Sequence, residues 1–154
     1  MNHIEIEKYR PCTEALRFRM QYQTFKEAWQ ACPRGDWMLW IAQRVGVDLR
    51  TITRAKALCA LTVRHLMKDE RSIKACEVAL KFADGEATRE ELDAAADDAD
   101  AAAYAAYADA AAAAYAVAAV ADADARIKSQ QQTADICREH LTSAVFEKLK
   151  QWKI

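Results

Sequence analysis

Glycine and proline are scarce in this chain, which has three glycines and two prolines among its 154 residues. Hairpin turns and flexible linkers rely on these residue types. Their scarcity therefore argues against a fold built from strands and tight turns. The length of the chain, with 53% apolar and 29% charged residues, is typical of one domain with a single core. We expect an all-α fold, a single-domain helical bundle that covers 1–154.

Long apolar runs are missing too. The longest uncharged run of the alanine-rich part, 110–121, has twelve residues, whereas a membrane-spanning helix needs about 18 or more. The first ten residues, MNHIEIEKYR, contain no apolar signal core. The five cysteines follow no spacing that is typical of secreted disulfide frameworks: Cys12, Cys32, Cys59, Cys76 and Cys137. We therefore expect a cytoplasmic protein without a membrane partner, whose thiols stay reduced.

Recognisable catalytic motifs are absent from the sequence. It contains no Gly-rich phosphate loop, paired-histidine metal motif or nucleophile elbow. The nearest approach to a metal pattern is Cys137 and His140, three residues apart, with Cys59 or His65 as a further ligand. A buried cysteine beside a surface histidine is the commoner meaning of this spacing. We expect no enzymatic activity, no metal and no cofactor.

The first part of the chain is expected to begin with an extended arm over 1–12. Apolar and polar residues alternate in HIEIE, and Pro11 closes the segment. A first helix should cover 13–22. Thr24 and Glu27 then stand at the spacing of a capping box, which predicts a second helix that ends before CPRG.

Capping residues also mark the next two helices. Asp36 is expected to cap a short, buried helix over 37–45, with Gly46 at its C-terminal end. Asp48 is expected to cap a helix over 49–68, because no glycine or proline interrupts this segment.

Four basic residues recur every three or four positions, with gaps, along the predicted 49–68 helix: Arg50, Arg54, Arg64 and Lys68. One interpretation of such a stripe is a nucleic-acid-binding surface, but four charges without interleaved aromatics, in a chain of pI near 6.3, provide little attraction for nucleic acid. A stripe that is solvated, or that faces the acidic alanine-rich helix of the same molecule, fits better. We expect no direct contact with nucleic acid.

The most unusual segment is 93–125, in which 21 of 33 residues are alanine. It follows a predicted helix over 70–83 with Gly85 at its end, and a capping box formed by Thr88 and Glu91. Alanine has the highest helix propensity, so the segment predicts a helix rather than a linker.

The alanine-rich helical segment is expected to extend over 88–141, which contains neither glycine nor proline. One straight helix of this length would measure about 80 Å, whereas a compact chain of this size has a radius of gyration near 15 Å, that is, roughly a fifth of that length. We therefore expect a bend or turn in the polar sequence DADARIKSQQQT at 122–133, followed by a returning helix. Its core residues should be Ile136, Leu141, Val145, Leu149 and Trp152.

Charge is distributed unevenly along the chain. The net charge is −1, but residues 86–126 hold ten acidic and two basic residues, a local charge of −8. At helical spacing, carboxylates and phenol rings fall on one face: Asp93, Asp97, Asp100, Tyr104, Tyr107 and Tyr115. We predict this acidic-aromatic face as a partner-binding site, because tyrosine is enriched in binding hot spots. The alternatives are that the tyrosines fill gaps between helices, or that Asp97, Asp100 and Tyr104 form a metal or acid-base cluster.

A second, small-residue face begins with Leu92, Ala96 and Ala99 and continues to Ile127. Alanine at a seam lets another helix approach closely, so self-association through this seam is possible.

Several of these segments occur in an order that resembles a known family. WMLWIAQRVG at 37–46, GEATREEL at 85–92, the Ala/Asp/Tyr tract and ADICREHL at 134–141 resemble the alanine-rich immunity proteins of bacterial polymorphic toxin systems. The resemblance covers 36–141. It implies an all-helical protein that neutralises a cognate toxin by binding it, and it brings no catalytic motif.

Three functional interpretations follow. The first is a non-enzymatic inhibitor, an antitoxin-like immunity protein that binds a toxin through the acidic-aromatic face. The second is a phage or mobile-element inhibitor of a nucleic-acid-processing complex of the host, which uses the same face as a partial mimic of a phosphate backbone. The third is a small helical metal-binding protein.

Overall fold

The computed structural model describes residues 4–101 and 123–150. These ranges are helical and contain no strand, which confirms the all-α prediction. The helices and their bounds are α1 (Ile4–Glu7), α2 (Thr13–Met20), α3 (Phe25–Ala31), α4 (Gly35–Arg44), α5 (Leu49–Leu61), the 3-10 turn η1 (Arg64–Leu66), α6 (Glu70–Ala83) and α8 (Ala123–Lys150). Residues 89–101 are helical as well. No helix among the described residues is both long enough and apolar enough to cross a membrane.

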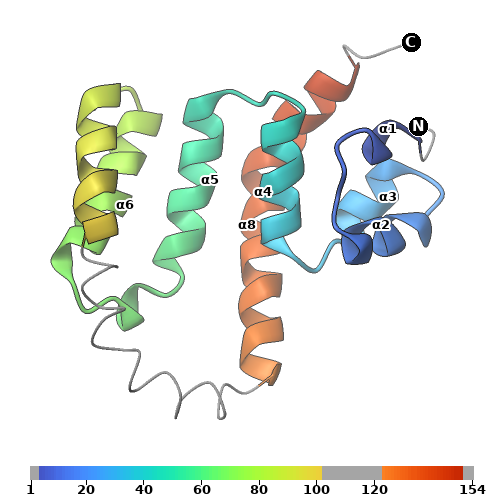
Figure 1. Cartoon of the computed structure of the whole chain (residues 1–154), viewed down its shortest axis with the longest axis horizontal. Coiled ribbons are helices and arrows are strands. Elements are labelled where there is room, and N and C mark those ends of the chain that lie inside the picture. The colour runs from blue at the N-terminus through green and yellow to red at the C-terminus, as the bar shows by residue number, and fades with distance from the viewer. Residues whose placement is uncertain (1–3, 102–122, 151–154) are drawn as a thin grey trace.

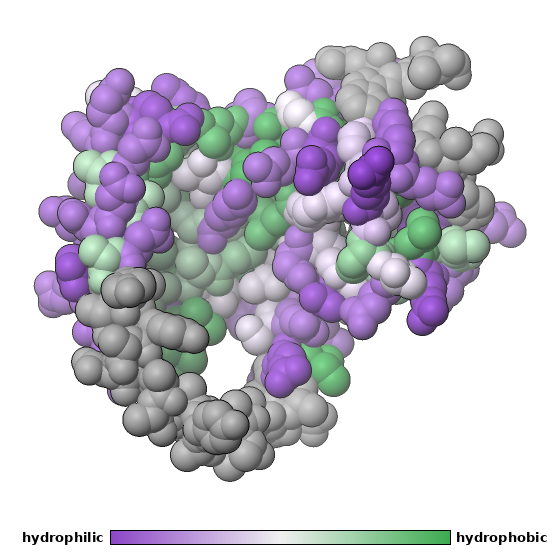
Figure 2. All heavy atoms as spheres, viewed as in Figure 1, coloured by the Kyte–Doolittle hydropathy of each residue, from purple (hydrophilic) through white to green (hydrophobic). Residues whose placement is uncertain are grey.

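The helices are arranged around α4, α5 and α8, which pack against one another (Figure 1). α6 packs on the outer side of α5, and residues 89–101 lie next to α6. The short helices α1, α2 and α3 gather on the opposite side of the molecule, beside α4. In the space-filling view, hydrophilic side chains cover the side formed by α6 and residues 89–101 (Figure 2).

The core lies where α4, α5 and α8 meet. α4 contributes Met38 and Ala42, and α8 contributes Leu141 and Val145, all of which are at most 1% exposed. Leu141 and Val145 are predicted core residues, and their burial is confirmed. Ile136 is only half-buried, because Cys137 takes the inward position beside it. Leu149 packs at the edge of the core, and Trp152 lies outside the described residues.

Local capping signals define several helix ends as the sequence predicts. The Thr24 hydroxyl accepts a hydrogen bond from the Glu27 N–H at 3.2 Å, and the Glu27 carboxylate accepts one from the Thr24 N–H at 3.0 Å. Asp48 caps α5 by accepting from the Thr51 N–H at 2.9 Å. Gly46 follows α4 with a φ of 84°, a conformation that only glycine adopts without strain.

Two predictions for the first half are wrong. The expected arm over 1–12 instead contains helix α1, in which Ile6 is buried; a short alternation such as HIEIE does not separate strand from helix. Asp36 does not cap α4, which begins two residues before the predicted start, at Gly35, with Arg34 at the N-cap position. The Asp36 carboxylate is instead bound by the Arg34 guanidinium.

Two predictions for helix length are also wrong. The helix predicted over 49–68 ends at Leu61, where the Thr62 hydroxyl donates to the Cys59 carbonyl oxygen at 2.7 Å and competes with the helical pattern. The bend predicted at 122–133 is not seen over 123–133, which belongs to α8. Residues 89–101 and α8 lie apart, so they are not two parts of one straight helix (Figure 1).

Candidate functional site

The predicted acidic face begins on the helix that starts after Thr88. The Thr88 hydroxyl accepts from the Glu91 N–H at 3.1 Å, and the Glu91 carboxylate accepts from the Thr88 N–H at 3.3 Å. These two reciprocal hydrogen bonds form the predicted capping box, which fixes the residue at which the helix begins. Glu90 and Glu91 also place negative charge at the positive end of the helix dipole.

The structure brings Asp93, Asp97 and Asp100 together on one exposed face of residues 89–101. At 3.6 residues per turn, the three side chains project within about 40° of the direction opposite Ala95 around the helix axis. Ala95 itself lies against α6. The ladder therefore points away from α6. Asp93 forms an ion pair with Arg89 at 3.0 Å, and neither Asp97 nor Asp100 forms an ion pair with another described residue.

The opposite side of this helix faces α6 across a notch of about 390 Å³. Arg71 and Lys74 of α6 line it together with Glu91 and Asp98. Asp69, through its hydrogen bond to the guanidinium, and more weakly Asp98 raise the pKa of Arg71. Glu91 and Asp98 therefore lie beside basic residues of α6, whereas the ladder points away from α6.

The small-residue seam has a different register from the predicted one. Leu92, Ala95 and Ala99 are the less exposed residues, whereas Ala96 is exposed. This face lies toward α6, because the small side chain of Ala95 allows the two helices to approach closely. Tyr104, Tyr107 and Tyr115 lie outside the described residues, so the aromatic half of the face stays a prediction.

Three of the four residues of the predicted basic stripe have partners within the molecule. Arg54 forms an ion pair with Asp84 at 2.6 Å, and Arg64 lies 3.9 Å from Glu77. The Arg50 guanidinium lies over the Phe82 ring, 5.4 Å from its centroid. These partners belong to α6 and the turn that follows it, not to the alanine-rich segment.

A second candidate site is a cleft, which sequence reasoning missed, between α1–α3 and α4. It has a volume of about 330 Å³. Its lining includes five aromatic side chains: Phe18, Phe25, Trp29, Trp37 and Trp40. The sequence does contain three tryptophans within 29–40. They did not predict the cleft, because the helices that enclose it meet only in the tertiary fold.

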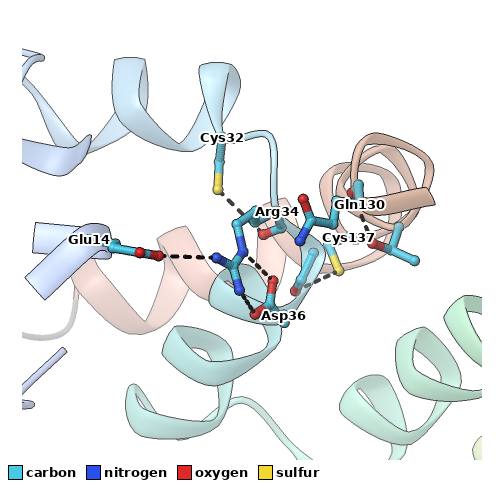
Figure 3. Close-up of polar contacts among 8 residues, drawn as sticks. Glu14, Cys32, Arg34, Asp36, Gln130 and Cys137 are labelled. Carbon is cyan, nitrogen blue, oxygen red and sulfur yellow. Dashed lines mark hydrogen bonds and ion pairs between the residues drawn. The ribbon is translucent and has the colours of Figure 1, made fainter. Parts of the chain in front are cut away.

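Arg34 lies at the edge of this cleft in a network of charges. Figure 3 shows its guanidinium between the carboxylates of Glu14 and Asp36. The Asp36 contacts measure 3.0 and 2.6 Å, and the Glu14 contact measures 3.4 Å. The guanidinium also lies 4.5 Å from the centroid of the Trp37 ring. The hydrogen bond to Asp36 is the main cause of the raised pKa of Arg34.

Arg19 is the buried charge of the cleft, with 4% of its surface exposed. Its Nη1 donates to the Tyr22 carbonyl oxygen at 2.8 Å. Burial lowers the pKa of Arg19, and the negative charge of Glu27 opposes this effect. The guanidinium keeps its proton at any physiological pH, so the cleft contains a permanent positive charge.

The predicted metal ligands take other roles. Cys137 is fully buried and donates to the Gly35 carbonyl oxygen at 3.6 Å, while Cys59 donates to the Thr133 carbonyl oxygen at 3.7 Å. The Cys59 and Cys137 side chains also interact with each other; this interaction lowers the pKa of Cys59 and raises that of Cys137. Within 4–101 and 123–150, no three His, Cys, Asp or Glu side chains are placed to hold a metal ion.

No family model, curated protein or solved structure matches this chain.

Proposed function

We propose that this chain is a non-enzymatic, protein-binding inhibitor of the toxin-immunity kind, which covers the basic surface of a cytoplasmic toxin. One observation supports this proposal most strongly. The ladder of Asp93, Asp97 and Asp100 is exposed and directed away from α6, although basic residues of α6 lie beside the same helix.

The charge of this region suits a basic partner. Residues 86–101 contain seven acidic residues and one basic residue, a net charge of −6. A concentrated field of this kind speeds association with a surface of opposite charge, such as the nucleic-acid cleft of a nuclease toxin. By sequence, Tyr104, Tyr107 and Tyr115 continue the ladder, and we propose that they supply the apolar contact area that holds the complex.

The proposal is tested with the full chain as a tagged protein. A partner is captured from the bacterium that encodes the chain, and its association is followed at low and at physiological salt. The triple variant Asp93→Lys, Asp97→Lys, Asp100→Lys should associate at least about tenfold more slowly, with a weaker dependence on salt. Purified toxin should also lose its activity when the wild-type chain is added.

A matched control changes the same number of charges elsewhere. Glu77, Glu139 and Glu147 are exposed and lie on α6 and α8, so replacing all three with lysine alters the net charge equally. This control should associate at nearly the wild-type rate. If both triple variants slow association equally, the effect comes from the overall charge of the protein, and the ladder is not the binding face. A captured nucleic-acid-binding complex that is not a toxin would replace the immunity assignment with the mobile-element one.

A further inference from the structure

Two cysteines lie where α5 and α8 pack against each other, Cys59 on α5 and Cys137 on α8. The Cys59 thiol donates to the Thr133 carbonyl oxygen at 3.7 Å, and Thr133 precedes Cys137 by one turn of α8. The Cys137 thiol donates to the Gly35 carbonyl oxygen at 3.6 Å (Figure 3). Gly35 in turn packs closely against the Thr133 backbone. Both thiols therefore adjoin the same close contact between helices.

Small side chains let α5 and α8 approach closely at this point. Ala55, one turn before Cys59, and Ala134, one turn before Cys137, are both 0% exposed. Alanine at a helix contact brings the two backbones together. A disulfide needs such an approach, because the two Cα atoms that it joins lie about 4.4–6.8 Å apart. The Cys59 and Cys137 side chains already interact with each other in the reduced protein.

The two thiols differ in access to solvent and in acidity. Cys59 is partly exposed, whereas Cys137 is 0% exposed. The interaction with Cys137 lowers the pKa of Cys59; the interaction with Cys59, and after it burial, raises the pKa of Cys137. Oxidants such as hydroperoxides react with an accessible thiolate. Cys59 is therefore the thiol that reacts first, and Cys137 is the protonated neighbour.

We propose that Cys59 and Cys137 form a reversible disulfide when the protein meets a hydroperoxide. The Cys59 thiolate attacks one oxygen of hydrogen peroxide, the O–O bond breaks, and Cys59 becomes a sulfenic acid while hydroxide leaves. The Cys137 sulfur then attacks the Cys59 sulfur, the S–S bond forms, and the sulfenic hydroxyl leaves with the Cys137 proton as water. The hydroxide takes up the proton that Cys59 had released. The peroxide is reduced to two waters, and the two thiols are oxidised to one disulfide.

This disulfide would join α5 to α8 and close a loop of the chain that contains α6 and the Asp93–Asp97–Asp100 ladder. The inference goes beyond the proposed function and does not depend on the partner.

The first test maps the bond in the full chain, with Cys12→Ser to remove the exposed thiol. The protein is treated with hydrogen peroxide, its remaining thiols are blocked, and it is digested with trypsin without reductant. Trypsin releases the peptides 57–64 and 129–138, which contain Cys59 and Cys137 as their only cysteines. Cross-linking of these two peptides should exceed that of any other pair at least about tenfold, because the fold holds their thiols at high effective concentration.

Reversibility is part of the same test. Dithiothreitol should restore both thiols. The proposal is overturned if this cross-linked pair is absent, or if Cys59 is oxidised to a sulfinic acid without forming it.

The second test uses variants. Cys59→Ser should abolish the cross-link, and Cys137→Ala should leave Cys59 as a sulfenic acid that dimedone traps. Cys76→Ser is the matched control, because Cys76 is also partly buried but lies on α6; it should form the cross-link at the wild-type rate. Loss of the cross-link in Cys76→Ser, or its persistence in Cys59→Ser, would assign the bond to other thiols and overturn the proposal.

Unfolding provides a further control. In urea that unfolds the chain, the preference for the pair of 57–64 with 129–138 should disappear, because the helices no longer hold the two thiols together. An equal preference in the unfolded chain would contradict the structural basis of the proposal. If Cys137→Ala does not fold, the peptide map and the urea comparison still decide the question. Toxin neutralisation is measured separately, so failure here leaves the proposed function intact.

Discussion

Gly35 of α4 packs against the backbone of Thr133 in α8 so closely that a Cβ atom built on Gly35 would lie 2.6 Å from the Thr133 hydroxyl oxygen and 2.7 Å from the Thr133 carbonyl carbon. The Cys137 thiol, one helical turn further along α8, donates to the Gly35 carbonyl oxygen. The first turn of α4 therefore fits onto α8 without space for a side chain.

Gly35→Ala should destabilise the protein by about 1–3 kcal/mol, because the added methyl group must push α4 and α8 apart. Alanine raises helix propensity, so a loss of stability would come from this contact alone. Urea unfolding measures the difference. Gly46→Ala is an informative comparison: Gly46 has open space around it, and its cost of about 1 kcal/mol would come from the positive φ. A Gly35→Ala protein at least as stable as the wild type would contradict the close contact.

Thr142→Val should cost about 1–3 kcal/mol, although the two side chains have nearly the same shape. The Trp29 indole Nε1–H donates to the Thr142 hydroxyl at 2.9 Å, and valine leaves this donor without an acceptor in a mostly buried place. Thermal unfolding measures the loss. In Thr62→Val, the hydroxyl removed donates only to the Cys59 carbonyl, so this control should lose less. Equal losses would show that the indole does not depend on Thr142.

Cys59 should be alkylated before the other partly or fully buried cysteines, Cys32, Cys76 and Cys137. The interaction with the Cys137 side chain lowers the pKa of Cys59, so the reactive thiolate of Cys59 forms at a lower pH than usual. Burial raises the pKa of Cys32 and of Cys76. Iodoacetamide labelling followed by peptide mass analysis, in a Cys12→Ser background that removes the exposed thiol, gives the order.

A Cys137→Ala variant provides the control for this thiol pair. Without the Cys137 thiol, the pKa of Cys59 should rise, and the labelling of Cys59 near neutral pH should slow severalfold. Unchanged labelling would mean that exposure alone, rather than the interaction between the two thiols, determines the reactivity of Cys59.

Asp48 should make α5 sensitive to acid. The Thr51 N–H, and secondarily the Thr51 hydroxyl, hold the pKa of Asp48 below its usual range. A carboxyl with a lowered folded-state pKa stabilises the protein above its unfolded pKa of about 3.9, and this contribution is lost as the pH falls through the folded value. Asparagine caps a helix at any pH. The stability advantage of the wild type over Asp48→Asn, measured by urea unfolding, should therefore shrink between pH 7 and about pH 3. A constant difference would contradict this role.

Features with a local cause could be predicted from the sequence. The capping boxes at Thr24 and Thr88, the Asp48 cap and the glycine at position 46 each depend on residues within one helical turn, so their patterns sufficed. The burial of Leu141 and Val145 followed from the helical period. The early end of α5 could not be foreseen, because Thr62 rather than a glycine or proline stops the helix.

Contacts between residues that lie far apart in the sequence could not be predicted, because no local pattern indicates them. The contact of Arg34 with Glu14 and the interaction between Cys59 and Cys137 exist only once the helices have packed together. The aromatic cleft likewise requires α2, α3 and α4 at once. The acidic ladder could be predicted, because its three carboxylates share one helix, but which of its neighbours face α6 depended on the packing.

The central position of α8 affects the order in which the molecule can be made. Trp29 and its hydrogen-bond partner Thr142 are separated by 113 positions in the sequence, and the buried side of α4 rests on Leu141 and Val145. A ribosome releases about 5–20 residues per second, so a nascent chain that already carries α1 to α6 waits several seconds for this helix. During that interval the apolar faces of α4 and α5 lack their cover, and a chaperone that shields them would find its substrate at this stage of synthesis.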